Sequence, residues 1–431
     1  MVSLEVLLPA LCLALLAIFA RLTLGSWLAP GAFFPLFWTG LIAISMTFQD
    51  YPLWGPAIWW IDGSLLLFYV GSLLAQGTAS KKGRKRRIAP DPNVKFKHLD
   101  KLVVSCSALG VLYILTREWF APTVADSPPA WFQLLLGALY AGPLFGGMLF
   151  ASEPSRRERF IGLLSVLPAL IYAFAYLGRS PMLAALYFWA AGFWSIRTLR
   201  CRGRVPLITP KLIVLAPMLF LALSATGTII GALRRDAFGV PLSERVAGYR
   251  GVLGEADPEK EWAGFRGAVF GHPFSFSYYL KRALDRPPEP QYGALTFSGP
   301  MELAGFRQRA PSENFALDRN VSSNVYTLFR PPIEDFGLVG SFFSFLFAGF
   351  LAGLAYVRIA RGQVIWAPIT NMFYPHVLVI GGYFFSYNST IVAHAFVGLY
   401  LCWHLNQQRG EKRVRTSMVE RVACGLSRTS Q

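Results

Sequence analysis

The chain of 431 residues has few cysteines and lacks the short motifs of soluble nucleotide and metal chemistry. Three of its five cysteines lie within apolar segments, and none falls between residues 234 and 335. No disulfide is therefore expected to staple that segment in an oxidising compartment. No cysteine or histidine pair has metal-ligand spacing, and no Walker or dinucleotide-type glycine motif occurs. We expect neither a metal nor a nucleotide cofactor.

Charged residues are also scarce, at 15% of the chain, whereas hydrophobic residues make up 54% and the mean hydropathy is +0.42. This balance excludes an ordinary soluble domain. Apolar runs of roughly 18–23 residues recur, and each is long enough to cross a hydrocarbon core of about 30 Å as a helix. Eleven runs fit, with approximate limits 4–20, 27–48, 54–76, 102–121, 130–151, 160–177, 181–196, 211–233, 336–357, 364–385 and 390–405.

Acidic residues are fewer than basic ones, 24 against 41, and the basic excess gathers beside the apolar runs. Eleven crossings place all the basic loops on one side, which the positive-inside rule assigns to the cytoplasm. The N-terminus and residues 234–335 are then outside, and the C-terminus is inside. Because no aromatic stacking platform is interleaved with the basic clusters, they indicate topology and not nucleic-acid binding. These clusters lie at 81–101, 156–159, 197–204, 358–361 and 409–421.

The sequence therefore predicts an all-α polytopic membrane protein of about eleven transmembrane helices. Residues 1–233 hold eight of them, 234–335 form a large outer loop, 336–405 hold three more, and 406–431 form a basic tail. No basic residue precedes the first apolar run, so we predict a retained helix and not a cleaved signal.

The outer loop is predicted to be a partly helical cap over a membrane cavity. It has equal numbers of basic and acidic residues, and its aromatic content argues against disorder. Asp257-Pro258-Glu259 has the pattern of a helix start, and a short helix is also expected at Met301–Arg309. Between them, an amphipathic helix ending at Pro287 is expected to lie flat at the outer interface. Its apolar residues at helical spacing are Phe276, Tyr279, Leu280, Ala283 and Leu284.

Polar residues crowd into the segment where the chain re-enters the membrane, and such groups are costly to desolvate and tend to mark a site. Asp335 either caps the following helix or takes part in that site. Arg330 either pairs with Glu334 or Asp335, or binds an anionic group such as phosphate. The candidate residues of this segment are Asn324, Tyr326, Thr327, Arg330, Glu334 and Asp335.

Several other charged or titratable residues on the outer side each have two possible interpretations. Arg179, in a tight outer hairpin, either snorkels to the interface or is a second phosphate ligand. Arg234 and Arg235 either anchor to lipid headgroups or join the site. His394, near the outer surface, is either a packing residue or a base. His272 is expected to be loop-borne and free to titrate.

Several segments resemble those of one family: Leu28-Ala29-Pro30 with the aromatic run to Trp38, Gly178-Arg179-Ser180, Tyr278-Tyr279-Leu280, residues 292–297, Asn324-Val325-Tyr326-Thr327 and residues 335–340. They resemble the O-antigen polymerase family, the oligosaccharide repeat-unit polymerases of bacterial surface-polysaccharide assembly. As architecture the resemblance covers most of the chain.

The resemblance implies a GT-C-like, metal-independent and normally inverting glycosyltransferase in the bacterial inner membrane, with its site facing the periplasm. Its donor is a growing glycan on undecaprenyl pyrophosphate, and its acceptor is a new lipid-linked repeat unit. Arg179 and Arg330 would hold pyrophosphate, and Asn324, Tyr326 and Thr327 would hold sugar hydroxyls, with Tyr279 nearby. Glu334, Asp335 or His394 would act as the base. A chain-length co-polymerase and a flippase are expected partners.

Three alternatives remain from the sequence. An O-antigen ligase shares this plan but usually depends on a loop histidine, and His272 is the only one here. A flippase of lipid-linked sugar needs a site near the midplane, whereas the polar groups here gather on one face and no internal repeat is visible. The third alternative is a structural membrane partner without catalysis.

Overall fold

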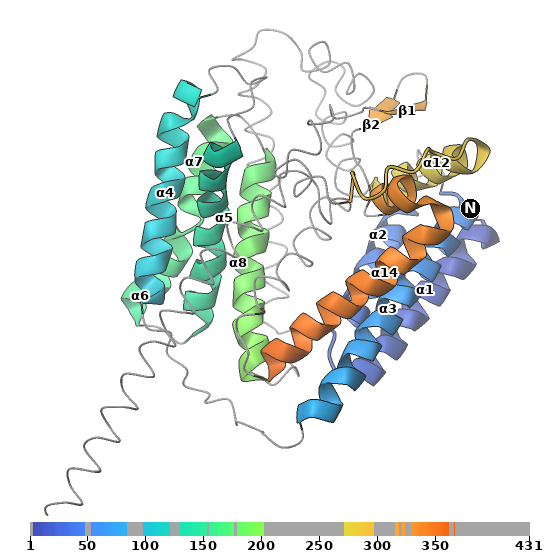
Figure 1. The fold of residues 1–431 in the computed structure, drawn as a ribbon, viewed down its shortest axis with the longest axis horizontal. Coiled ribbons are helices and arrows are strands. Elements are labelled where there is room, and N and C mark those ends of the chain that lie inside the picture. The colour runs from blue at the N-terminus through green and yellow to red at the C-terminus, as the bar shows by residue number, and fades with distance from the viewer. Residues whose placement is uncertain are drawn as a thin grey trace, which may run out of the picture.

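Figure 1 shows the computed structural model, which describes residues 3–47, 53–83, 98–120, 130–152, 155–175, 179–201, 271–296, 315–318, 321–323, 327, 329–361 and 366. These residues form helices and one small antiparallel ribbon. In chain order the elements are α1 (Leu4–Leu24), α2 (Pro30–Ser45), α3 (Gly55–Gly83), α4 (Leu99–Phe120), α5 (Ala130–Ala151), α6 (Arg156–Leu164), α7 (Leu167–Ala175), α8 (Arg179–Arg200), α12 (His272–Asp285), β1 (Phe315–Asp318), β2 (Val321–Ser323) and α14 (Arg330–Ala360).

The helices agree with the predicted membrane segments wherever the chain is described. The first seven segments coincide with α1 to α8, where α6 and α7 share one segment, and the ninth coincides with α14. Segments 211–233 and 390–405, and all of 364–385 except Trp366, lie outside the described residues. Five spans are long and apolar enough to cross a membrane: α1, α3, α4, α6 with α7, and α14. The protein is therefore a multi-pass membrane protein, and the total of eleven crossings stays a prediction.

The sixth segment differs from its prediction because it is broken into two helices. A reciprocal capping box of Ser155 and Glu158 starts α6, and the hydroxyl of Ser165 donates to the Gly162 carbonyl (2.7 Å) just past its end. Pro168 then falls in the first turn of α7, where its missing N–H costs nothing. The proline therefore fits a new helix start better than a continuous helix.

Two groups of helices stand side by side in Figure 1. One contains α1, α2, α3 and α14, with α12 across its end, and the other contains α4 to α8. The groups meet where α8 and α14 end, since Ile359 of α14 packs among Ile196 and Leu199 of α8. From that meeting point α8 and α14 diverge toward their first residues.

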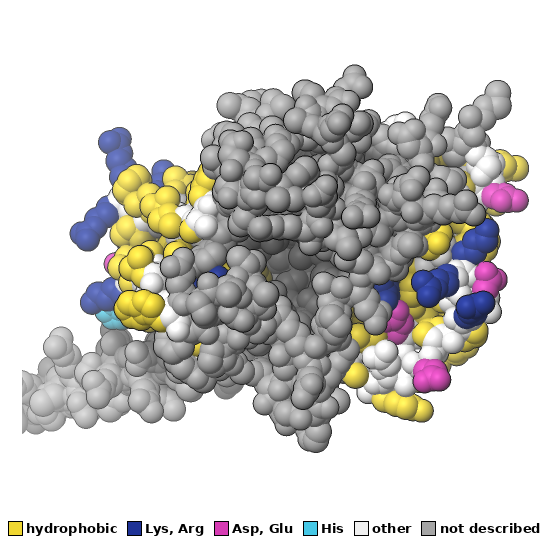
Figure 2. All heavy atoms as spheres, turned by 90° about the horizontal axis from the view of Figure 1, so that it is seen from above, with side chains coloured by type: hydrophobic (Ala, Val, Ile, Leu, Met, Phe, Trp, Pro, Cys, Tyr) yellow, Lys and Arg dark blue, Asp and Glu magenta, His cyan; other side chains and the backbone are white. Residues whose placement is uncertain are grey.

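The two ends of the molecule differ in charge. Arginines at the start of α6 and in the last turns of α8 and α14 lie at one end, called here the basic end. The first turns of α1 and α14 lie at the opposite end with α12, called here the α12 end. Figure 2 looks along the molecule from above and shows both signs of charge on the side of α12. The separation agrees with the predicted topology, in which the basic end faces the cytoplasm.

The outer loop contains the predicted amphipathic helix, but that helix packs on the bundle. Phe276, Leu280 and Ala283 of α12 are buried, and the first two join the core formed by α1, α2, α3 and α14. The Trp54 N–H donates to the hydroxyl of Ser277 (3.3 Å) and ties α12 to the start of α3. The apolar face of α12 therefore packs on the bundle, although Leu284 is 46% exposed, and the expected position of α12 at the outer interface stays a prediction.

The rest of the loop contains one unexpected element, two expected helices that are not described, and one helix end that agrees with its prediction. The ribbon of β1 and β2 was not expected from the sequence, and Phe315 pairs there with Ser323. The helix start at Asp257 and the short helix at Met301–Arg309 lie outside the described residues. Helix α12 ends at Asp285, just before Pro287, as the proline predicts.

Helices α3 and α14 pack backbone to backbone through small residues. A Cβ on Gly71 would overlap the Leu346 carbonyl, and a Cβ on Gly349 would overlap the Phe68 carbonyl. The hydroxyl of Ser72 donates to the Gly349 carbonyl (3.0 Å). Close approach of this kind is typical of membrane helix pairs. It fixes α14, whose first turn carries the candidate site, to the rest of the bundle.

Gly349→Ala is expected to destabilise the protein, because the added methyl group has no room against the Phe68 backbone. Overpacking of this kind costs about 1–3 kcal/mol. The thermal midpoint of the purified protein in detergent should fall by several degrees. Gly77→Ala is the matched control, since a Cβ there meets nothing within 4 Å. Equal midpoints for both variants would contradict this description of the interface.

Candidate functional site

Helix α14 is interrupted at Gly337, the second residue of the predicted membrane segment 336–357. Gly337 has φ 71° and ψ 178°, a combination that is available essentially to glycine alone. The break frees backbone carbonyls just before it. The carbonyl of Glu334 accepts from the Gln291 N–H, and that of Asp335 accepts from the Tyr292 N–H, both at 3.0 Å. The short helix 330–336 is thereby joined to the segment that follows α12.

The side chain of Asp335 strengthens the same junction. Its carboxylate, which is fully buried, accepts from the Leu295 N–H (3.0 Å) and from the Thr296 N–H. We call this arrangement, formed by residues 334–335 and 291–296, the clasp. Of the two interpretations left open for Asp335, a cap of the following helix does not describe these bonds, because both carboxylate oxygens accept from the loop backbone. The sequence did not reveal this role because the partners lie about 40 residues away in the chain.

Arg330 is held between an acid and an aromatic ring. Its Nε donates to Glu334 Oε1 at 2.6 Å, and its guanidinium carbon lies 5.2 Å from the centre of the Tyr279 ring. The Arg330 side chain is buried, with 9% exposure. Of the alternatives left open for Arg330, the structure thus contains the ion pair with Glu334, and α12 adds a cation–π contact. The pair also fixes the direction of the guanidinium.

Tyr279 belongs to this cluster as well. Burial is the main reason that the pKa of its hydroxyl is raised, and the nearby Glu334 carboxylate raises it further, while Arg330 acts in the opposite direction. The phenol therefore stays neutral around pH 7 and keeps its proton for hydrogen bonding. Its ring also packs beside Phe276, which is part of the core.

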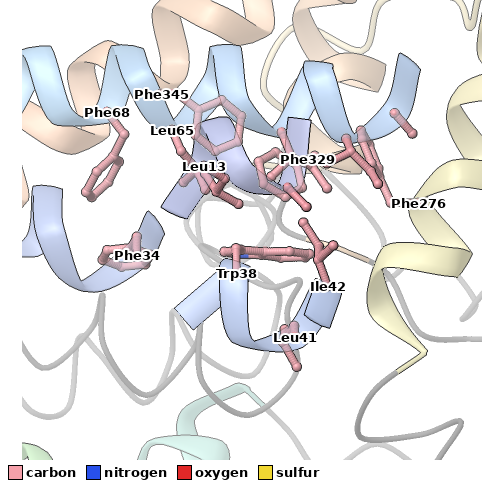
Figure 3. Close-up of a cluster of buried hydrophobic side chains, with 14 of the residues drawn as sticks. Leu13, Phe34, Trp38, Leu41, Ile42, Leu65, Phe68, Phe276, Phe329 and Phe345 are labelled. Atoms are coloured by element: carbon pink, nitrogen blue, oxygen red, sulfur yellow. The ribbon is translucent and has the colours of Figure 1, made fainter. Parts of the chain in front are cut away.

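Buried aromatic side chains pack together at the start of α14, and Figure 3 shows them. Phe329, immediately before Arg330, is fully buried, and its ring centre lies 4.9 Å from that of Trp38, 5.0 Å from Phe276 and 5.1 Å from Phe345. Thr327, two residues earlier, is buried, and its carbonyl accepts from the Arg330 N–H (3.1 Å). Its hydroxyl has no hydrogen-bond partner among the described residues. The aromatic contacts of Phe329 and the Arg330–Thr327 backbone bond thus hold the start of α14 on the bundle.

The other predicted site residues are placed only in part. Arg179 is the first residue of α8, so its backbone lies toward the same end of the molecule as Arg330, while α8 and α14 touch near their last residues. The structure thus groups Arg330, Glu334, Tyr279 and Asp335. Outside the described residues lie Asn324, Tyr326, Arg234, Arg235 and His394.

His272 does not match its prediction. It is the first residue of α12 and only 3% exposed, and its Nδ1 has no hydrogen-bond partner among the described residues. Burial disfavours the imidazolium and lowers the pKa of His272 to about 4. A freely titrating loop histidine was expected, but the residue is a neutral packing group.

The buried His272 predicts a pH dependence of stability. In the unfolded chain this histidine takes up a proton near pH 6.5, whereas in the folded protein it does so only near pH 4. Its contribution is therefore complete above pH 6.5 and is lost as the pH falls toward 4, by up to roughly 3 kcal/mol. His272→Gln should lessen the drop in thermal midpoint between pH 7 and pH 4.5. An unchanged drop would contradict this assignment.

Two buried ionisable residues in membrane helices were not singled out from the sequence. Asp62 in α3 is 8% exposed, and both carboxylate oxygens lack a hydrogen-bond partner among the described residues. Arg117 in the last turn of α4 is 9% exposed and lies beside Tyr113. The signal that could have found them is the rarity of such groups within apolar runs.

Comparisons with protein families, with curated proteins and with solved structures gave no match. Among the described residues, no group of three histidine, cysteine or acidic side chains could hold a metal ion. What the described cluster offers is a buried, oriented guanidinium at the first turn of a membrane-spanning helix, next to a firmly held loop segment. Such an arrangement suits an anionic group at a membrane surface.

Proposed function

We propose that the protein is a polymerase that joins undecaprenyl-pyrophosphate-linked oligosaccharide repeat units at the outer face of the bacterial inner membrane. The observation that carries the proposal is the position of Arg330. Its guanidinium is oriented by Glu334 and Tyr279 at the start of a membrane helix, at the end opposite the basic loops. The resemblance of the loop and re-entry segments to repeat-unit polymerases supplies the substrate class.

The proposed reaction transfers the donor glycan from one lipid to the acceptor. The bond between the anomeric carbon and the pyrophosphate oxygen breaks, and that oxygen keeps the electron pair. A bond forms between the anomeric carbon and a hydroxyl oxygen of the acceptor sugar, whose proton is released. Negative charge therefore grows on the departing lipid pyrophosphate, and a fixed cation there stabilises the transition state more than the ground state.

Arg330 takes that role in the proposal, with Arg179 as a second cation. Glu334 and Asp335 were proposed as bases from the sequence, but their oxygens accept from Arg330 and from the loop backbone. We therefore give them positioning roles: Glu334 orients the guanidinium, and Asp335 holds the loop against the site. The sugar-binding roles of Asn324, Tyr326 and Thr327 stay part of the proposal, because this segment leads directly into Arg330.

Deleting the gene from its host tests the class of function. The proposal predicts surface lipid that carries a single repeat unit and no longer chains, with polymer restored by the cloned gene. Loss of all surface glycan with polymer accumulating on the carrier lipid would indicate a ligase. Single lipid-linked units retained on the cytoplasmic side would indicate a flippase, and unaltered glycan would remove the proposal.

A further inference from the structure

Tyr292 is unusual in both exposure and backbone conformation. At 84% it is the most exposed large hydrophobic side chain among the described residues. Its φ is 49°, a left-handed conformation that is uncommon for residues other than glycine, asparagine and aspartate. The adjacent Gly293 has φ 91° and continues the same turn. An aromatic ring is thus displayed on a backbone that is unfavourable for it, a combination found at functional sites.

The turn that carries Tyr292 is held firmly by the clasp. The Tyr292 N–H donates to the Asp335 carbonyl and the preceding Gln291 N–H donates to the Glu334 carbonyl, both at 3.0 Å. Three residues further on, the Asp335 carboxylate binds the next pair of N–H groups. The ring is therefore displayed from a backbone fixed on both sides. A fixed aromatic ring binds with a small loss of conformational freedom.

The anchoring point of Tyr292 lies close to Arg330. Asp335 follows Arg330 by five residues in the short helix, which is about 7.5 Å along a helix axis. If a ligand places its anionic group at Arg330, the Tyr292 turn is within reach of the chemical group next to that anion. In a lipid-linked glycan that next group is a sugar ring.

We propose that Tyr292 is a stacking platform for a pyranose ring of the glycan substrate. The C–H bonds on one face of a pyranose carry partial positive charge and are attracted to the electron-rich face of an aromatic ring. The observations that support this are the exposure of the ring, its fixed turn and the bond of that turn to Asp335, five residues after Arg330. The proposal rests on the proposed function for the identity of the glycan, but the binding it describes is measured without catalysis.

The test is glycan binding by the full-length purified protein in detergent. The probe is the water-soluble oligosaccharide released by mild acid from the host's lipid-linked repeat units, labelled and measured by equilibrium dialysis. Tyr292→Phe keeps the ring and should bind within about twofold of the unchanged protein. Tyr292→Asn and Tyr292→Gly lose the ring but tolerate the left-handed backbone. Both should weaken binding about tenfold, the order of one aromatic stacking contact.

A folding defect in Tyr292→Asn or Tyr292→Gly would also weaken binding, so the thermal midpoint of both variants is measured. Each should keep the midpoint of the unchanged protein. Equal binding by the ringless variants and the unchanged protein would overturn the proposal, and so would no binding by the unchanged protein. If the ringless variants bind normally but are less stable only in lipid vesicles, the ring is an interfacial anchor and the proposal is wrong. Glycan binding without polymer formation would leave the stacking in place and remove the polymerase function.

Discussion

Replacement of Arg330 by alanine is expected to reduce polymer formation by about 100-fold or more. The guanidinium is the one described cation fixed at the start of α14, and removal of a preorganised donor that stabilises developing charge typically costs 10²–10³ in rate. Arg330→Lys should recover only part of the activity, because an ammonium group lacks the planar fork that pairs with phosphate oxygens. The measurement is the rate of chain growth by purified variants on lipid-linked repeat units.

The loss must be separated from a folding defect, since Arg330→Ala leaves the Glu334 carboxylate in a partly buried place without this partner. The double variant Arg330→Gln with Glu334→Gln removes both charges and should be well folded but inactive. Arg286→Ala is the matched control, because Arg286 is exposed at the end of α12 in the same region. Polymer formation by the double variant at the rate of the Arg286 variant would exclude Arg330 from the chemistry.

Replacement of Asp335 by alanine is expected to open the clasp. It leaves the Leu295 and Thr296 N–H groups without their acceptor, at a cost of about 1.5–3 kcal/mol for each bond to a charged group. The segment 291–296 should detach while the membrane helices stay folded. Chymotrypsin cleavage after the exposed Tyr292, which lies within this segment, should become at least tenfold faster, and polymer formation should fall by a similar factor.

The same junction can be weakened through the backbone. Gly337→Ala places a methyl group on a residue with φ 71°, so the kink that frees the Glu334 and Asp335 carbonyls becomes strained although the space around it is open. It should reproduce the chymotrypsin sensitivity of Asp335→Ala. Gly40→Ala, in α2 with nothing within 4 Å of the new methyl group, should not. Normal resistance to chymotrypsin at Tyr292 in both Asp335→Ala and Gly337→Ala would refute the clasp.

The membrane helices could be predicted because their signal is local and strong. Each described span is a run of apolar residues bounded by arginines or turn residues, and hydrocarbon allows few structures other than a helix there. The break between α6 and α7 was missed because Pro168 follows an otherwise continuous apolar run. A proline in a membrane helix is compatible with either a kink or a new start.

The site was predicted only in part because its decisive contacts are between distant parts of the chain. The Arg330–Glu334 pair lies within one helical turn and was among the alternatives that the sequence left open. The contact of Arg330 with Tyr279, and that of Asp335 with Leu295 and Thr296, depend on how α12 docks on the bundle. The sequence carries no spacing rule for such contacts.

For His272 the prediction was wrong, because the residue type suggested an exposed, titrating side chain whereas the side chain is buried. A histidine in a long polar loop is expected to be exposed, but α12 turns its first residue toward the bundle. Tyr292 was noted only as part of a motif, because exposure and a positive φ cannot be read from the residue name.

The most direct test of the account uses the purified protein and lipid-linked repeat units from its host, with no lipid A-core added. Products are resolved on a gel over time. The account predicts a ladder of carrier-linked dimers, trimers and longer glycans from the unchanged protein, and none from the Arg330→Gln, Glu334→Gln variant. Repeat units that keep their original mass in the presence of well-folded protein would contradict it.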